Sequence, residues 1–208
     1  MNTKVVKLSG AKTDLSKLES AAHELVAGGV VVFPTDTVYG IAANAFDAKA
    51  CKKIYALKGR SYRKPLTLMV RDLKALRLIA EVPDDLRKLI DVFWPGQLTL
   101  IFRTTHIGNI LTGGRKNIGV RIPDSAVVRG LLQYCEFPIA TTSANPSGKE
   151  SAKTGRDAME YFRGKADMVI DGGRCEHNRE STVVDVQKFP YVVIREGCLK
   201  SKKLLKYI

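Results

Sequence analysis

The sequence lacks several features that mark common classes of protein. No run of apolar residues approaches the ~20 that a membrane-spanning helix needs. The opening MNTKVVKLSG has no long apolar core and no small-residue cleavage site. The histidines lie far apart, and no cysteine belongs to a C-x-x-C pair. We therefore expect a cytoplasmic protein with no membrane partner, no disulfide framework and no metal site of its own. The four reduced thiols would be Cys51, Cys135, Cys175 and Cys198.

Common phosphate-binding and nucleophile motifs are also missing. The chain contains no G-x-x-x-x-G-K-[ST] loop, no G-x-G-x-x-G loop and no G-x-S-x-G nucleophile elbow. If the protein binds phosphate, other groups must therefore hold it.

Positive charge is the feature present in excess. Lys and Arg number 34 against 21 Asp and Glu, so the formal net charge is +13. A field of this sign attracts anions, such as nucleic acid, nucleotides, phosphate or an anionic membrane surface. A solvated basic surface without a specific partner would have the same composition. Charge alone does not choose between these possibilities.

Hydrophobic periodicity predicts an α/β protein. Helical and strand patterns alternate early in the chain, and strands follow one another later, which indicates one domain with a twisted, open, mixed parallel/antiparallel sheet and helices on its faces. Asp14 or Ser16 would cap the first helix, Asp47 and Asp72 would cap later ones, and residues 103–117 are predicted to form a polar loop. Helices are predicted over residues 15–27, 47–59, 72–79, 83–93, 125–135, 156–164 and 200–208. Strands are predicted over residues 30–33, 65–70, 97–102, 118–122, 138–145, 166–173, 181–186 and 191–196.

Polar side chains follow three of the predicted strands. Ligands of open α/β sheets collect at the carboxyl ends of strands, where hydroxyls and amides bind polar groups and arginine binds carboxylate or phosphate. The same residue types also stabilise ordinary turns and helix caps, so each cluster alone has two readings. The clusters are Thr35, Asp36, Thr37 and Tyr39; Thr141, Thr142, Ser143, Asn145 and Ser147; and Arg195 with Glu196.

The densest basic stretch is LKGRSYRKPL, residues 57–66. Lys58 and Arg60 are two positions apart, so both would face one side of an extended segment and could clamp an oligophosphate. The alternative is that these cations close a helix C-terminus, where the helix dipole favours them. Arg121 lies inside the apolar strand IGVRI, where its charge needs a ligand, a partner aspartate or an exposed edge.

Seven short motifs occur in one order that is typical of a known family. They are FPTDTVYG, KGR before KPL, WPG-x-LT, GVRIPD, TTSANPSG, STVVDV and REG. On these motifs the chain resembles the YrdC-like threonylcarbamoyl-adenylate synthases over about residues 20–197. The resemblance implies one YrdC-like domain over residues 1–208, with its core at about 15–197 and a basic tail at 198–208. It also implies a positively charged concave cavity.

The resemblance further implies an adenylate-forming nucleotidyltransferase. L-Threonine, bicarbonate or CO2, and ATP with Mg2+ would give threonylcarbamoyl-AMP and pyrophosphate. A tRNA threonylcarbamoyl-transfer complex would use the product to modify adenosine 37 (t6A) of tRNAs that read codons beginning with A. Lys58 and Arg60 would be catalytic. The implied threonine-binding residues are Thr35, Thr37, Tyr39, Arg121, Thr141 and Ser181. The implied ATP-binding residues are Lys58, Arg60, Lys64, Asn117, Ser143, Asn145, Ser151 and Arg195.

Two departures and two alternatives accompany the resemblance. Ser61 replaces a proline found in many members, and Met69 replaces a histidine that some members have near the threonine. A non-catalytic module that binds double-stranded RNA or tRNA would account equally well for the charge. It would show steep salt dependence and no threonine-dependent cleavage of ATP. A carbamoyl-adenylate enzyme with another acceptor is the third reading, although its extra zinc-finger-like and acyl-phosphatase-like modules are not found in this sequence.

Overall fold

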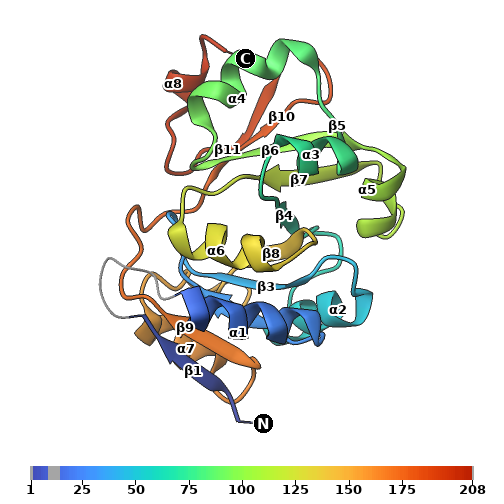
Figure 1. Cartoon of the computed structure of the whole chain (residues 1–208). Coiled ribbons are helices and arrows are strands. Elements are labelled where there is room, and N and C mark those ends of the chain that lie inside the picture. The colour runs from blue at the N-terminus through green and yellow to red at the C-terminus, as the bar shows by residue number, and fades with distance from the viewer. Residues whose placement is uncertain (1, 9–14, 208) are drawn as a thin grey trace.

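One continuous mixed sheet organises the molecule (Figure 1). The computed structural model describes residues 2–8 and 15–207. Within those residues the strand order is β1-β9-β2-β3-β8-β4-β7-β6-β10-β11, and the short β5 also pairs with β6. Parallel and antiparallel pairs both occur, so the predicted mixed α/β sheet is confirmed. The strands are β1 (Lys4–Lys7), β2 (Val31–Phe33), β3 (Gly40–Asn44), β4 (Thr67–Met69), β5 (Ala80–Glu81), β6 (Leu98–Thr104), β7 (Asn117–Arg121), β8 (Ile139–Ser143), β9 (Met168–Asp171), β10 (Thr182–Asp185) and β11 (Val192–Arg195).

The helices pack on the sheet through three hydrophobic clusters. At the β9-β2-β3 end, α1 and α6 cover one face, and α2 and α7 cover the other. At the β4-β7-β6-β10 end, α3, α4 and α8 cover one face. The helices are α1 (Leu15–Val26), α2 (Ala48–Lys58), α3 (Leu73–Ile79), α4 (Arg87–Phe93, preceded by a 3-10 turn over Asp84–Leu86), α5 (His106–Leu111), α6 (Ala126–Tyr134), α7 (Gly155–Phe162) and α8 (Ser201–Leu204).

At the β4-β7-β6-β10 end of the sheet, one face packs against helices and the other face lines a cavity. On β6, Leu98 and Leu100 point into the hydrophobic core, whereas Thr99 and Ile101 line a cavity on the opposite face. The strands β4, β7 and β10 alternate in the same way. Because successive side chains of a strand point to opposite faces, one set of strands supplies both the core and the floor of this cavity.

The predicted helix caps are largely confirmed. The Asp47 carboxylate accepts hydrogen bonds from the backbone N–H groups of Lys49 and Ala50, and Asp72 accepts one from Ala75. Ser16 was wrong as a cap because α1 already begins at Leu15, and the alternative, Asp14, lies outside the described residues. The predicted loop over residues 103–117 was also wrong in part, because it contains α5, capped by Thr105. The strands β1, β3 and β5 were not predicted.

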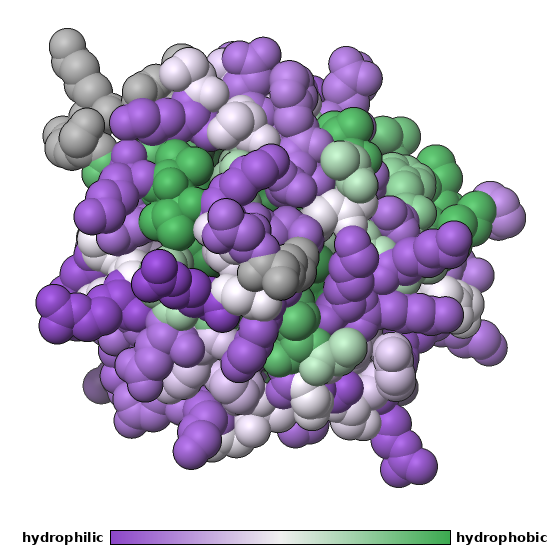
Figure 2. All heavy atoms as spheres, turned by 90° about the horizontal axis from the view of Figure 1, so that it is seen from below, coloured by the Kyte–Doolittle hydropathy of each residue, from purple (hydrophilic) through white to green (hydrophobic). Residues whose placement is uncertain are grey.

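Packing continues beyond residue 197, where the core was expected to end. Leu199 and Leu204 are buried in the cluster that also contains α4, and the Tyr207 ring contacts that of Phe93. No helix in the described part of the chain is long and apolar enough to cross a membrane. At the end that carries β1, α1 and α7, hydrophilic side chains cover most of the surface and hydrophobic ones form separate groups (Figure 2).

Candidate functional site

A cavity of about 700 Å³ lies over the uncovered sheet face. Its walls come from segments far apart in the sequence: the turn after β2, the loop between α2 and β4, and the chain around β10 and β11. The predicted residues that line it are Thr35, Thr37, Tyr39, Arg60, Lys64, Asn117, Arg121, Thr141, Ser143, Ser181 and Arg195. The structure therefore brings most of the predicted site residues to one concavity.

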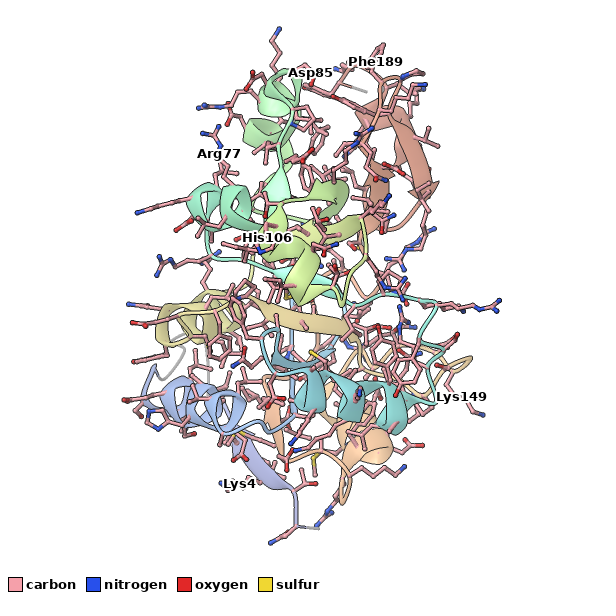
Figure 3. The ribbon with its side chains drawn as sticks, turned by 90° about the vertical axis from the view of Figure 1, so that its right-hand side faces the viewer. Lys4, Arg77, Asp85, His106, Lys149 and Phe189 are labelled. Atoms are coloured by element: carbon pink, nitrogen blue, oxygen red, sulfur yellow. The ribbon has the colours of Figure 1, made fainter. Side chains whose placement is uncertain are left out.

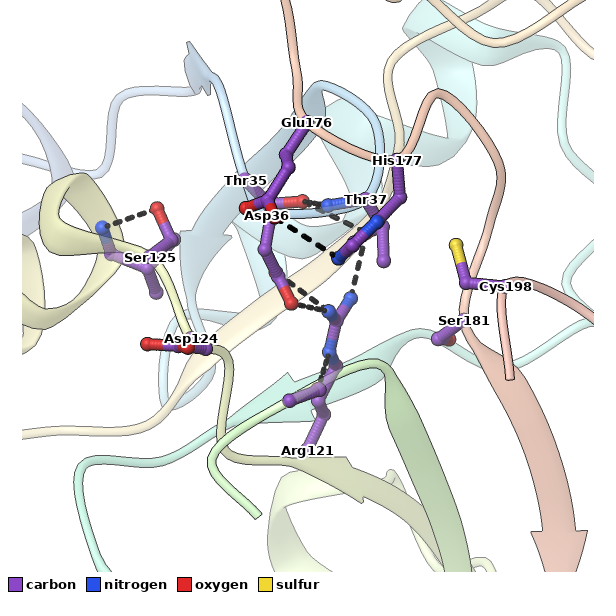
Figure 4. A network of polar contacts seen from close by, with 12 residues as sticks. Thr35, Asp36, Thr37, Arg121, Asp124, Ser125, Glu176, His177, Ser181 and Cys198 are labelled. Atoms are coloured by element: carbon purple, nitrogen blue, oxygen red, sulfur yellow. Dashed lines mark hydrogen bonds and ion pairs between the residues drawn. The ribbon is translucent and has the colours of Figure 1, made fainter. Parts of the chain in front are cut away.

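One end of the cavity is lined by hydroxyl groups. The Thr35 hydroxyl donates to the Val38 carbonyl at 2.7 Å and lies 2.9 Å from the Thr37 hydroxyl (Figure 4). The Thr141 hydroxyl donates to the Ile41 carbonyl at 3.2 Å. Since the Thr35 hydrogen is used, its oxygen accepts from the Thr37 hydroxyl and also from the Thr37 N–H at 3.0 Å, so both of its lone pairs are engaged inside the protein. Thr141 keeps lone pairs for a ligand that donates hydrogen bonds, such as an amine or a hydroxyl. Tyr39 differs, because its hydroxyl is already bonded to the backbone of Gly172 and Gly173.

Arg121 is buried beside these hydroxyls and has a partner aspartate. Its Nη2 lies 2.6 and 2.7 Å from the two carboxylate oxygens of Asp36, and its Nη1 donates to the Thr37 hydroxyl at 2.8 Å (Figure 4). Nε donates to the Gly96 carbonyl at 2.8 Å. Burial lowers the pKa of Arg121 and Asp36 opposes this, so the ion pair explains how a charge is accommodated inside the strand. Within the described residues, an Nη1 hydrogen remains for a ligand. It supplies one hydrogen bond to a carboxylate rather than a two-pronged clamp.

Ser181 belongs to a second hydroxyl pair on the opposite wall. Its hydroxyl lies 2.8 Å from that of buried Thr99, and one of the two therefore keeps a hydrogen to donate. The Ser181 carbonyl accepts a hydrogen bond from Arg195 Nη2 at 2.9 Å. Gly197 packs directly behind this segment, since a Cβ at Gly197 would lie 2.1 Å from the Glu180 carbonyl oxygen. The motifs STVVDV and REG thus meet in space.

Cations surround the other end of the cavity. Arg60 donates from Nε to the Lys64 carbonyl and from Nη2 to the Pro65 carbonyl, both at 3.0 Å, which fixes the loop between α2 and β4. Arg63, Lys64 and Arg115 lie on the same side of the cavity. Arg115 is fixed to the same loop by a hydrogen bond from Nη2 to the Tyr62 carbonyl. A concavity lined by several cations, two of them held by the backbone, is suited to a polyanion such as a triphosphate.

Three predicted residues do not line the cavity: Lys58, Asn145 and Ser151. Lys58 is only 3% exposed, and its ammonium bonds the Ser143–Asn145 turn. The prediction that Lys58 and Arg60 face the same side was wrong. Lys58 ends α2, and Gly59 (φ 60°) then turns the chain, so the segment is not extended. Ser151 donates to the carboxylate of Glu180, a cavity residue, at 2.6 Å.

Several cavity residues were not predicted as site residues. Thr99 is the threonine of the quoted motif WPG-x-LT, but its place in the cavity was not predicted. Asp36 does not line the cavity but supports it through Arg121. A partner aspartate for Arg121 was one of the expected alternatives, but the separation of 85 positions gave no local signal that it would be Asp36. Asp185 belongs to the quoted motif STVVDV, but no role was assigned to it. Glu180 and Arg115 also line the cavity and belong to none of the quoted motifs.

Comparisons with known proteins identify the family to which this chain is similar. The family model of Sua5, YciO and YrdC, described as telomere recombination, matches residues 23–197. The threonylcarbamoyl-AMP synthase of Pyrococcus abyssi is 38% identical over 92% of this chain and 57% of its own length. A putative threonylcarbamoyl-AMP synthase of Methanocaldococcus jannaschii is 37% identical over 99% of both chains. The chain therefore spans little more than half of the first relative and nearly all of the second.

Solved structures have the same overall fold. P. abyssi Sua5 in complex with L-threonine superposes with a TM-score of 0.94 at 36% identity, over 99% of this chain and 61% of that one. Escherichia coli YciO superposes with a TM-score of 0.88 at 25% identity, over 99% of this chain and 100% of that one. The fold expected from the sequence is thus confirmed.

Proposed function

We propose, from the premise that this chain belongs to the Sua5/YciO/YrdC family, that it is a threonylcarbamoyl-AMP synthase. L-Threonine, bicarbonate or CO2, and ATP would give threonylcarbamoyl-AMP and pyrophosphate. One observation carries the proposal: a single cavity has a hydroxyl-lined end with Arg121 and an end lined by Arg60, Arg63, Lys64 and Arg115. An amino acid and a triphosphate would then lie side by side.

The chemistry needs positioning more than a reactive side chain. The threonine nitrogen adds to the carbon of CO2 and loses a proton, which forms a carbamate. A carbamate oxygen then attacks the α-phosphorus, and the bond to the pyrophosphate oxygen breaks. Carboxylate, carbamate and triphosphate repel one another, so fixed cations such as Arg60 and Arg195 would lower the cost of bringing them together. The free lone pairs of Thr37 and Thr141 would receive the amine and hydroxyl of threonine, with Thr35 holding Thr37 in place. A pocket that bonds a hydroxyl discriminates against analogues without one.

Mg2+ would enter with the triphosphate. No group of three or more His, Cys, Asp or Glu side chains in the described residues is arranged to hold a metal ion. The cavity does carry the carboxylates of Glu180 and Asp185. Glu180 precedes β10 and Asp185 ends it, so one of the two could join substrate phosphates around an ion. A single carboxylate fits Mg2+, which commonly binds through substrate phosphates with one or two carboxylates. The ion would supply charge neutralisation at the phosphates.

The wider setting follows from the same proposal. A cytoplasmic enzyme would have its substrates at hand and pass its labile product to the transfer complex that modifies adenosine 37 of tRNA. Binding of tRNA or double-stranded RNA by this chain itself is the alternative function, and the positive net charge supports it.

Pyrophosphate release tests the proposal directly. The protein is mixed with ATP, Mg2+ and bicarbonate, with and without L-threonine, and we expect release only when threonine is present. Arg60→Ala should abolish turnover, whereas Arg77→Ala, an exposed position on α3 far from the cavity walls, should not (Figure 3). Release that ignores threonine, or no release by the wild type, would contradict the proposed function.

A further inference from the structure

Lys58 lies behind the wall of the cavity rather than in it. It is the last residue of α2, it is 3% exposed, and it does not line the cavity that Arg60, two residues later, does line. A lysine carrying a full charge at such a position needs compensating partners. The identity of those partners decides what Lys58 can do.

The Lys58 ammonium has three hydrogens, and three acceptors surround it. It donates to the backbone carbonyls of Ser143 and Asn145, and to Asn145 Oδ1 at 3.1 Å. An ammonium group has no further hydrogen-bonding capacity once its three donors are used. A direct contact with a phosphate would require breaking one of these buried bonds.

The acceptors belong to Ser143, the last residue of β8, and to Asn145 in the turn that follows it. Asn145 Oδ1 also accepts from the Ser143 hydroxyl at 2.6 Å, and the Ser147 N–H donates back to the Lys58 carbonyl at 2.7 Å. Lys58 therefore holds this turn through both its side chain and its backbone. Ser143 is the member of the group that lines the cavity.

We infer that Lys58 is a positioning residue whose ammonium fixes the Ser143–Asn145 turn, and through it the Ser143 wall of the nucleotide end, without touching the phosphates. The inference rests on the proposed function, because it assigns a role within the ATP site. It replaces the catalytic and ATP-binding role that the family resemblance implied for Lys58, and it leaves Arg60 as the cation of the K-x-R pair that lines the cavity.

Amine acetylation of the wild-type protein tests the inference without any substitution. Peptide mass spectrometry would follow the reactivity of each lysine with and without MgATP. We expect Lys58 to be protected in both states, since its hydrogens are committed to the turn. Lys64, which is exposed and lines the cavity, should react in the free protein and become protected by ATP. A Lys58 that reacts in the free protein and is protected only by ATP would overturn the inference. Failure of ATP to protect Lys64 would instead contradict the proposed nucleotide site.

A mutant cycle provides a second, kinetic readout. Lys58→Met should raise the KM for ATP by about tenfold and change the KM for threonine by less than about twofold, because the threonine end is held by other residues. A merely structural defect would reduce kcat in proportion to the folded fraction and leave both KM values unchanged. Lys52→Met, which removes an exposed lysine from the same helix, is the matched control.

The double variant distinguishes an indirect action from a direct one. If Lys58 acts through Ser143, the Lys58→Met substitution should raise the KM for ATP much less in the Ser143→Ala variant than in the wild-type protein. Fully multiplicative effects of the two substitutions would mean that Lys58 binds ATP independently of Ser143, and would overturn the inference.

Discussion

Two aspartates make equally short contacts with arginines, but only one of these ion pairs is buried. Asp36 and Arg121 approach to 2.6 Å with side chains 1% and 4% exposed. Asp124 and Arg129 also approach to 2.6 Å, with side chains 60% and 55% exposed. Removing one partner of a buried pair leaves an uncompensated charge, whereas an exposed charge is stabilised by water.

Asp36→Asn should therefore lower the free energy of unfolding by about 3–5 kcal/mol, and Asp124→Asn by less than about 1 kcal/mol. Urea denaturation of the two variants measures both values. The double variant Asp36→Leu with Arg121→Met should recover part of the loss, because it removes both charges together. Equal losses for Asp36→Asn and Asp124→Asn would contradict the assignment of the Asp36 pair as the buried support of the cavity.

Protonation of Lys58 gives a pH-dependent prediction. Burial, and next the charge of Arg60, lower the pKa of Lys58 to about 8. Above that pH a neutral amine has two hydrogens for three acceptors, so the Ser143–Asn145 turn loosens and the KM for ATP should rise. Unfolded Lys58 keeps its proton up to its ordinary value of 10.5. Between pH 8 and 10.5 the unfolded state therefore binds more protons than the folded state, so the contribution of Lys58 to the free energy of unfolding increases with pH. Because this change stabilises the fold, weaker ATP binding in that window would not be caused by unfolding.

Steady-state kinetics across this pH window measure the effect. Lys58→Met should lose the pH-dependent rise in KM, and Lys52→Met should keep it. A KM for ATP that stays flat through pH 8 in the wild type would contradict the prediction.

At the scale of the elements, the close contact of the chain after β11 with the chain before β10 depends on a glycine. A Cβ at Gly197 would lie 2.1 Å from the Glu180 carbonyl oxygen and 2.5 Å from the Ser181 carbonyl, which are backbone atoms that cannot rotate away. Gly197→Ala should push these segments apart, cost about 1–3 kcal/mol and raise the KM for threonine because Ser181 moves.

Gly119 on β7 is the matched control for this substitution. Its Cβ would lie 3.6 Å from Thr67 Oγ1, an ordinary contact distance. Gly119→Ala should change the free energy of unfolding by less than about 0.5 kcal/mol. Thermal or urea denaturation compares the two variants, and similar stability losses would show that close packing at Gly197 is not the cause.

The elements also show what sequence could and could not predict. The hydroxyl clusters after β2 and at the end of β8 were readable because each follows apolar strand residues, and members of both clusters line one cavity. The strand β3 was missed because its residues, GIAAN, include types with weak strand preference, and its stability comes from pairing with β2 and β8. Lys58 was misplaced because the spacing of two cations says nothing about the left-handed turn at Gly59 between them. Long-range partners such as Asp36 and Arg121 become visible only when the sheet brings them together.

At the scale of the whole molecule, the net charge of +13 supports two different functions. A nucleotide site uses the cations that line its cavity, whereas an RNA groove uses cations spread over the surface. Arg63 lies in the cavity, and Arg77 is exposed on α3 (Figure 3). The variants Arg63→Gln and Arg77→Gln remove the same charge from these two locations and so separate the two functions.

For the synthase, Arg63→Gln should weaken MgATP binding by about tenfold, and Arg77→Gln should change it by less than about twofold. Isothermal titration with MgATP measures both affinities, and titration with a short double-stranded RNA at several salt concentrations measures the alternative. An RNA groove predicts that each substitution weakens RNA binding to a similar extent and reduces the slope of log affinity against log salt by about one unit. That outcome, together with pyrophosphate release that does not depend on threonine, would contradict the synthase and favour RNA binding by cations on the outer surface.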